Sequence, residues 1–331
     1  MTVAGLYQQV RESQLDCEFT VAEVPAHEGI YIGADREGQP CLFVRAYEQS
    51  AQPALRTDHV FLQLSQEYEL DTVDGSRVRQ ILHLLRCESS RSEDYETFLV
   101  LIGAFLRMYE GGTPTAENLT SFFHSLVRLF QVSPAGDRTR EREGLWGELF
   151  VMSRARGFRF WAPFWHSEAT RRFDFSSRDP DRRVEVKTTL GTQRIHHFSH
   201  RQIYAVGSEE ILIGSILVRE EDAGLSLRDL IQECRDVLAG TPHFFKLERA
   251  VRRAGMEDAN ETGPIFDGTE AEHNLAWFRS TDAPHFHMTE PSGVSGTRYM
   301  VDLVAAPRLS PDELEEWLDS GFLHQEELLA R

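Results

Sequence analysis

The stretch RRFDFSSRDPDRRVEVKTTL, residues 171–190, constrains the fold of this chain more than any other segment. Polar and apolar residues alternate on both sides of a turn at 178–182 that is rich in Asp and Pro. Asp and Pro suit a turn because Pro presets its backbone angle and Asp hydrogen-bonds to its own backbone. The pattern therefore predicts a β-hairpin with strands at 173–176 and 184–190.

Side chains alternate between the two faces of a strand, and this places the polar residues of the hairpin. Asp174 lies on the polar face of the first strand, and Glu185 and Lys187 share one face of the second. If the turn centres on Pro180, Asp174 falls opposite the segment 185–187. Two acids and one amine then meet at one junction, an arrangement that can bind a divalent metal.

The amine is itself unusual, since Lys187 and Lys246 are the only lysines among 35 basic residues. The other basic residues are arginine, so this chain uses Arg wherever a generic positive charge is enough. A lysine beside Glu185 indicates that a compact ammonium group is wanted there rather than a planar guanidinium.

Charge is unevenly distributed along the chain. The net charge is −18 and the isoelectric point is about 5.2, which argues against general nucleic-acid binding. Residues 136–205, however, contain 14 Arg and Lys against 9 Asp and Glu, a net charge of +5, and leave −23 for the remainder. This contrast favours a local site for a polyanion.

The 331 residues are enough for two domains. The four cysteines lack CxxC spacing and indicate free thiols in a reducing compartment. The N-terminus has no apolar signal core, and the longest apolar runs (98–106 and 211–218) are too short to span a bilayer. We therefore expect a soluble cytoplasmic protein that does not bind membranes.

Residues 1–132 are predicted to form an accessory domain of strands followed by a helical pair. The predicted elements are a hairpin within 28–46, strands at 60–64 and 79–86, and helices at 92–109 and 115–130.

Residues 133–331 are predicted to form a second, α/β domain. Glu148 lies within the apolar stretch GLWGELFV of the first predicted helix, where a carboxylate is costly unless it has a partner. Gly144 and Gly147 would let this helix approach the sheet closely. The predicted elements are a helix at 139–156, a strand at 159–164, the hairpin, a loop that leads into a short helix begun by Ser199, an apolar strand at 210–218, helices at 225–238 and 243–254, strand regions at 276–288 and 298–304, and a helix begun by Ser310.

Three histidines after the hairpin, His196, His197 and His200, have a spacing that can hold zinc. No Cys or acid completes the set, so a loop that faces phosphate is the preferred interpretation. No phosphate-binding loop of the Walker or GxGxxG type is present, which argues against nucleotide hydrolysis.

A helix with Glu148, a strand with Asp174, a turn, and a strand with Glu185 and Lys187 resemble, in this order, the core of the PD-(D/E)xK nuclease superfamily. Phe173 stands where the motif has Pro, a departure that the superfamily tolerates. The literal Pro-Asp pair at 180–181 lies in the turn and is interpreted as a decoy. The stretches GLWGELF, FDF, EVKTT and RIHHFSHRQI resemble more specifically the family called PD-(D/E)XK motif proteins, which occurs beside methyltransferases and ATPases in bacterial restriction and phage-defence loci.

The resemblance covers about residues 136–255. It implies an α/β fold with a restriction-endonuclease-like central mixed β-sheet flanked by helices, next to the β-rich and helical N-terminal domain. It also implies an Mg²⁺-dependent DNA endonuclease, with Mn²⁺ able to substitute, that acts with protein partners such as a methyltransferase or an ATPase, or as a homodimer.

The residues that match the motif receive roles from the same resemblance. Asp174, Glu185, the Val186 carbonyl and Glu148 would hold the metal, and Lys187 would orient water or stabilise charge. The residues expected to contact DNA are Arg194, His196, His197 and Gln202. Two alternatives remain open: a nuclease-fold DNA-binding or assembly module that is inactive without partners, and a nuclease for RNA or single-stranded ends.

Overall fold

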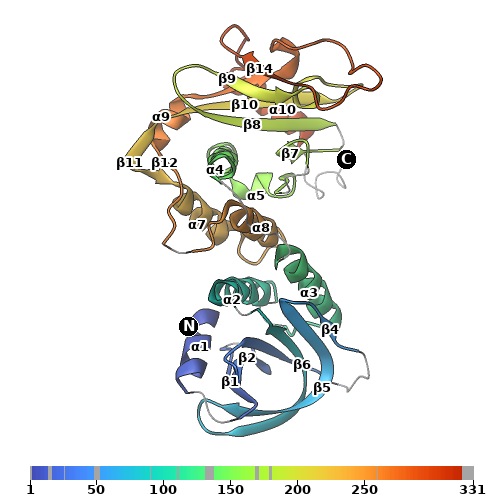
Figure 1. Cartoon of the computed structure of the whole chain (residues 1–331), viewed down its shortest axis with the longest axis vertical. Coiled ribbons are helices and arrows are strands. Elements are labelled where there is room, and N and C mark those ends of the chain that lie inside the picture. Colours follow the sequence, from blue (N-terminus) through green and yellow to red (C-terminus); the bar gives the residue numbers. More distant parts are fainter. Residues whose placement is uncertain are drawn as a thin grey trace. The chain divides into compact units, whose positions relative to one another are not determined.

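The computed structural model describes residues 2–13, 17–25, 27–47, 53–89, 91–109, 112–130, 138–167, 171–178, 181–258 and 260–322. The chain folds into two compact units, residues 1–133 with 239–248, and residues 134–238 with 249–331 (Figure 1). The first division lies one position from the boundary expected after residue 132. We did not expect the segment 239–248 in the first unit, because residues 134–238 and 249–331 on either side of it belong to the second unit.

The first unit consists of a curled sheet and three helices. Its helices are α1 (Val3–Glu12), α2 (Ser92–Arg107) and α3 (Ala116–Phe130), and its strands are β1 (Phe19–Glu23), β2 (Ile30–Asp35), β3 (Pro40–Arg45), β4 (Leu55–Arg56), β5 (Val60–Thr72) and β6 (Arg77–Cys87). The strand order is β1-β2-β3-β6-β5-β4, and β1 also pairs with β5 in parallel, so the sheet curls back on itself (Figure 1). The predicted hairpin, the later strands and both predicted helices are confirmed, whereas α1 and β1 were not predicted.

The two faces of this sheet bury different cores. One face packs against the helices, with Leu42 and Val44 of β3 in the same cluster as Phe98 of α2. The other face encloses an aromatic cluster in which Phe43 contacts Phe19 edge-on at 5.1 Å. Alternation along β3 thus sends neighbouring apolar residues into two cores, which explains why the strand is almost continuously apolar.

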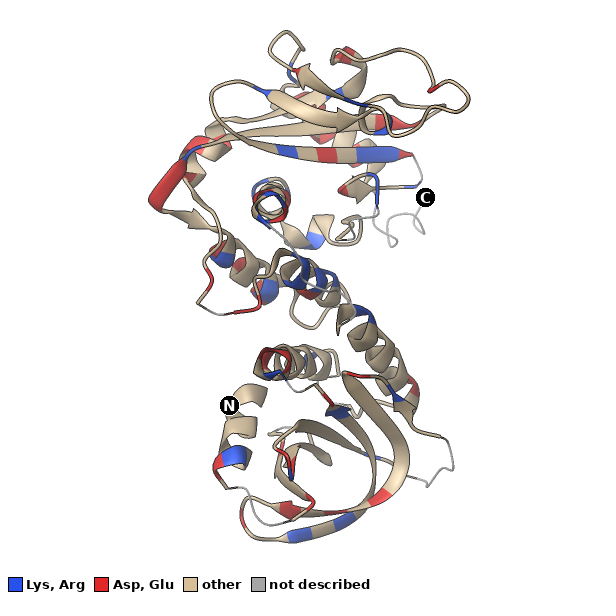
Figure 2. Cartoon of the chain, viewed as in Figure 1, with Lys and Arg blue, Asp and Glu red and all other residues tan. Residues whose placement is uncertain are grey.

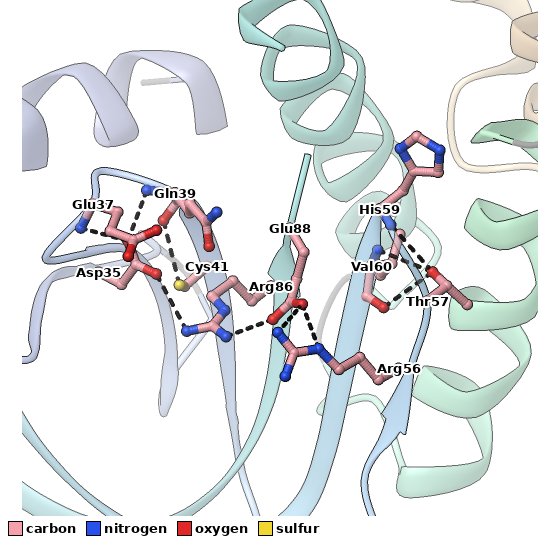
Figure 3. Close-up of polar contacts among 10 residues, drawn as sticks. All are labelled: Asp35, Glu37, Gln39, Cys41, Arg56, Thr57, His59, Val60, Arg86 and Glu88. Atoms are coloured by element: carbon pink, nitrogen blue, oxygen red, sulfur yellow. Dashed lines mark hydrogen bonds and ion pairs between the residues drawn. The ribbon is translucent and has the colours of Figure 1, made fainter. Parts of the chain in front are cut away.

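Charged side chains of the first unit form a chain of ion pairs at the ends of its strands (Figure 3). Arg86 contacts Asp35 (Nη1 to Oδ2, 3.2 Å) and Glu88 (Nη2 to Oε1, 2.5 Å), and Arg56 contacts Glu88 at 2.7 Å. The carboxylates of Asp35 and Glu88 are nearly buried, so these ion pairs offset the cost of removing them from water.

The second unit contains the remaining elements and a mixed sheet. They are α4 (Thr139–Arg154), α5 (Phe158–Trp161), β7 (Phe175–Ser176), β8 (Arg182–Leu190), β9 (Ile195–Ser199), α6 (His200–Ile203), β10 (Glu210–Val218), β11 (Glu220–Ser226), α7 (Leu227–Leu238), α8 (Phe244–Ala254, whose first residues belong to the first unit), β12 (Ile265–Phe266), α9 (Gly268–His273), β13 (Leu275–Arg279), η1 (Ser280–Asp282), β14 (Arg298–Asp302) and α10 (Pro311–Gly321). No helix in the described ranges is both long and apolar enough to cross a bilayer.

The central sheet has the order β13-β10-β8-β7. β10 pairs in parallel with β8 and antiparallel with β13, and β7 pairs antiparallel with β8. α4 packs on β8 (Figure 1). The predicted mixed α/β fold, the hairpin, the central position of the apolar strand β10 and the helices α4, α7, α8 and α10 are confirmed.

Three predicted elements of the second unit are wrong. In the strand region predicted at 276–288, only β13 is a strand, and η1 follows it directly. The segment predicted as a strand at 159–164 begins with the short helix α5, because a short apolar run does not distinguish a strand from a buried helix. The segment predicted as a loop before Ser199 is the strand β9, which pairs with β14 about 100 residues later in the chain. The partner strand decides this structure, and no local pattern reveals it.

A glycine of α4 permits the close contact between this helix and β8. A Cβ atom on Gly147 would overlap the Thr188 hydroxyl and lie 3.5 Å from Val186 Cγ1. The predicted close approach is thus confirmed for Gly147 and wrong for Gly144, where a Cβ would meet nothing within 4 Å.

We expect Gly147→Ala to destabilise the second unit by about 1–3 kcal/mol, because the added methyl group forces α4 away from β8. Gly144→Ala, in the same helix, is the matched control and should stabilise the protein by about 0.5–1 kcal/mol through helix propensity. Urea unfolding of both variants measures the difference. Equal effects would contradict the role of Gly147.

Candidate functional site

The structure gathers the four predicted acid and amine residues around β8. Glu148 lies on α4, Asp174 directly precedes β7, and Glu185 and Lys187 lie on β8. Burial raises the pKa of both Glu148 and Glu185, and the charge of Asp174 raises both further, as expected for carboxyl groups that share one neighbourhood.

Glu185 is the most constrained residue of this group, with 3% of its surface exposed. Its Oε1 atom accepts hydrogen bonds from Lys187 Nζ at 2.6 Å and from Gln202 Nε2 at 2.7 Å. Its Oε2 atom is buried and has no hydrogen-bond partner. The protein therefore supplies hydrogen bonds to one oxygen of Glu185, whereas the other oxygen has no hydrogen-bond donor.

Gln202 owes its orientation to a helix cap. In the capping box of α6, its Oε1 atom accepts from the Ser199 N–H at 3.0 Å. This bond turns the amide nitrogen toward Glu185 and the Arg172 carbonyl, 3.2 Å away. We predicted a DNA contact for Gln202 and missed its contact with Glu185, although the S-x-x-Q spacing of a capping box was readable from the sequence.

Asp174 is positioned by the hairpin. Phe175 pairs with Val184 in an antiparallel arrangement, so Asp174, the residue before Phe175, lies beside the residues of β8 that follow Val184. There Asp174 Oδ2 accepts a hydrogen bond from the Val186 N–H at 2.7 Å. The predicted position of Asp174 opposite residues 185–187 is confirmed, and the Pro-Asp pair at 180–181 lies partly outside the described residues.

Glu148 is held by a tryptophan that the sequence did not indicate. Its Oε2 atom accepts a hydrogen bond from Trp165 Nε1 at 2.7 Å. Trp165 is fully buried and forms a β-bridge with Phe175 of β7. The helix carboxylate and the hairpin are thus linked through one side chain.

Burial dominates the proton affinities of the site. It raises the pKa of Glu148 and of Glu185 to about 8 in each case, and the charge of Asp174 contributes to both shifts. Burial also raises the pKa of Asp174. For Lys187, burial lowers the pKa, but the surrounding carboxylates outweigh it and the net shift is upward. The amine therefore stays charged at neutral pH, while Glu148 and Glu185 hold their protons more tightly than ordinary glutamates.

The donor atoms of the site fit a hard divalent cation. Carboxylate oxygens are the ligands that Mg²⁺ and Mn²⁺ prefer, and the partnerless Glu185 Oε2 is suited to such an ion. In the described part of the chain, no three His, Cys, Asp or Glu side chains are arranged to hold a metal together. The carboxylates alone thus do not form a complete set of ligands, and waters would have to complete the coordination of a bound ion.

The residues predicted to contact DNA lie in different surroundings. Arg194 is buried and donates hydrogen bonds to the Ser215 carbonyl at 2.7 Å and the Asn274 carbonyl at 2.5 Å. His196 is also buried and contacts Ser215 Oγ at 2.7 Å, and burial lowers its pKa to about 4. Only His197 is exposed. The side chains of Arg194 and His196 support β10 from within the unit rather than face solvent.

The zinc alternative finds no support in the described residues. His200 contacts Tyr299 Oη at 3.0 Å and the Met288 carbonyl at 2.8 Å, whereas His196 contacts Ser215. The histidines thus have separate partners, and no metal-binding group of this kind is formed in the described ranges.

A comparison with protein families agrees with this geometry. Residues 8–304 match the model of the family described as "Putative PD-(D/E)XK family member, (DUF4420)". The chain belongs to this family. Neither the search of curated proteins nor that of solved structures found a match. The family relationship and the mixed sheet together establish a nuclease-like fold.

The raised pKa values predict how stability depends on pH without metal. A glutamate has an ordinary pKa of 4.5, so the folded state binds the Glu148 proton more tightly than the unfolded state does. Stability should therefore fall as the pH rises from about 4.5 to about 8. In EDTA, Glu148→Gln should remove this loss and exceed the wild type by about 3 kcal/mol at pH 8, but differ little at pH 5.

Urea unfolding at pH 5 and pH 8 tests this prediction. Glu316→Gln, on the exposed face of α10, is the control and should leave the pH dependence unchanged. A Glu148→Gln variant that is less stable than the wild type at pH 8 would show that the ionised carboxylate is the stabilising form.

Proposed function

We propose that this chain is a metal-dependent DNA endonuclease that hydrolyses phosphodiester bonds at Glu148, Asp174, Glu185 and Lys187. The observation that carries the proposal is the buried Glu185, one oxygen of which is held by Lys187 and Gln202 while the other has no partner. An unpartnered buried carboxylate is costly, and a bound cation would remove that cost. Membership of the family supports a nuclease rather than another metalloenzyme.

Each residue of the candidate site has a separate role in the proposed hydrolysis. Asp174, Glu185 and the Val186 carbonyl would hold Mg²⁺ or Mn²⁺, and Glu148 would contact the ion through water. When bound, the ion supplies charge neutralisation at the phosphate and acidifies the attacking water. Lys187, which is charged at neutral pH, orients the water or stabilises the negative charge that develops on the phosphate.

Glu148 is suited to hold a proton near neutral pH because its pKa is raised to about 8. The hydrogen bond from Trp165 keeps the Oε2 atom of this carboxyl group in place. A carboxyl group that titrates close to the working pH can exchange a proton with water or with the leaving oxygen.

The proposed setting is a bacterial restriction or phage-defence system in the cytoplasm, with a methyltransferase or an ATPase as partner, or with a second copy of this chain. The resemblance of the motif stretches supports this setting. A second candidate is a DNA-binding or assembly module that needs its partner to act. The observation that favours it is that no three acidic, His or Cys side chains in the described residues are gathered as metal ligands.

A cleavage assay on plasmid DNA with Mg²⁺ tests the proposed activity. Asp174→Asn and Lys187→Ala should each lower kcat/KM by about 10²–10⁴-fold, because each removes a group that acts on the reacting phosphate. Lys246→Ala, which changes the only other lysine, is the matched control and should cleave like the wild type. Undiminished cleavage by both site variants would overturn the assignment.

Titration with Mn²⁺ separates the two candidates. Because the ion must displace a proton from Glu185, whose pKa is about 8, affinity should rise up to tenfold per unit between pH 6 and 8 and level off above. Calorimetry in two buffers of different ionisation enthalpy should show the release of a proton. If the purified chain binds no Mn²⁺ at pH 8, the partner-dependent module is favoured.

A further inference from the structure

The ammonium group of Lys187 contacts both a carboxylate and an aromatic ring. Its Nζ atom donates a hydrogen bond to Oε1 of Glu185, the only acidic residue of β8, which lies between basic ones (Figure 2). The same Nζ atom lies over the ring of Phe198, 5.1 Å from the ring centroid. This distance is within the range of a cation–π interaction, in which the negative face of an aromatic ring attracts a positive charge. Phe198 is therefore a second group that holds the amine.

The aromatic ring stabilises the amine without using its hydrogen-bond donors. An ammonium group has three N–H donors, and Glu185 is the only hydrogen-bond acceptor of Lys187 in the described part of the chain. A ring attracts the positive charge as a whole, whereas a second carboxylate in the same place would take up another N–H. Two donors thus remain for a water molecule or a phosphate oxygen, and 21% of the Lys187 side chain is exposed to meet one.

The strand β9 keeps the Phe198 ring in place. Alternation along β9 turns His196 and Phe198 inward and leaves His197 exposed. Phe198 is 1% exposed, and the His196 ring meets it edge-on, with the two centroids 6.3 Å apart. His196 in turn contacts Ser215 Oγ at 2.7 Å, and Ser215 pairs with Lys187 in the sheet. The ring cannot turn away from the amine without breaking contacts between β9 and the central sheet.

The segment that carries Phe198 also carries a partner of Glu185. Ser199, the next residue, caps α6, and the capping box directs Gln202 Nε2 to Glu185 Oε1 at 2.7 Å. Phe198 and Gln202 therefore contact the two members of one ion pair. The end of β9 and the start of α6 together hold this pair on the face of β8.

We propose that Phe198 is a positioning residue for Lys187, which holds the ammonium group through its charge and leaves N–H donors for the reacting water or phosphate. This inference rests on the proposed nuclease function and adds the group that fixes the direction of the amine. A misplacement of about 1 Å can cost about 10²-fold in rate, so the ring contributes to kcat rather than to DNA affinity. His196, for which we predicted a DNA contact, then acts indirectly by supporting the ring.

Nuclear magnetic resonance of the metal-free protein tests the contact without requiring cleavage. Because Lys187 and Lys246 are the only lysines, protein labelled with ¹³C-lysine has two Cε–Hε groups, and Lys246→Ala assigns them. The ring current of Phe198 should shift the Lys187 signal upfield, and the two Hε protons should differ because the side chain is held. Phe198→Leu should return the signal to the ordinary position and merge the two protons. An unshifted Lys187 signal in the wild type would overturn the proposal.

Fluorinated phenylalanine at position 198 tests the role of the ring in cleavage. One, two and three fluorine atoms weaken the negative face of the ring in steps and change its size little. In the plasmid assay with Mg²⁺, kcat should fall with each fluorine atom and be about tenfold lower in Phe198→Leu, with KM nearly unchanged. Fluorination of Phe278, a buried ring of the same hydrophobic cluster, is the matched control and should leave kcat unchanged.

The Lys187→Ala background separates a cation–π interaction from simple packing. Fluorination at position 198 should have no effect on the residual rate there, because the charge is absent. A loss that persists without Lys187, equal losses for Phe198 and Phe278, or an unchanged kcat across the fluorinated series would each overturn the proposal. If the wild type does not cleave DNA, the proposed function fails, and the lysine signal alone decides whether Phe198 holds the amine.

Discussion

Two buried carboxyl groups, Glu148 and Glu185, and a half-buried third, Asp174, lie beside one lysine, and the candidate site depends on this constraint. Each ionised carboxylate loses its hydration on burial, and Lys187 can balance only one of them. The raised pKa values of Glu148 and Glu185 follow from this shortage of positive charge. Such a cluster either retains protons or accepts a cation, and both states are useful to a metal-dependent hydrolase.

The protein maintains this cluster by arranging it around a single strand. α4 packs closely on β8 at Gly147. Asp174 of the hairpin accepts a hydrogen bond from the backbone of β8, and Gln202 of α6 donates one to Glu185. β8 also pairs in parallel with β10 along its whole length in the middle of the sheet. The site is therefore built largely on regular elements, which hold side chains more firmly than loops do.

The same strand connects the acids to a region of opposite charge. Arg172, Arg178 and Arg183 line a cavity where β8 pairs with β7, so the acidic cluster and these arginines lie within one unit. The local positive charge of residues 136–205 thus has a structural counterpart, although the arginines concerned are not those that we first predicted.

Alternation and helical periodicity alone determined the hairpin, the central apolar strand and the helices that carry the site. They also indicated Glu148, Asp174, Glu185 and Lys187, because their chemistry is local to each element. Only the tertiary structure decided the partners of these residues. Trp165 contacts Glu148, Gln202 contacts Glu185, and Arg194 is buried against Ser215, at separations of 17, 17 and 21 residues along the chain. β9 is a strand only because β14 pairs with it. Periodicity reports which face of an element is buried, but not which distant atom will satisfy a buried polar group.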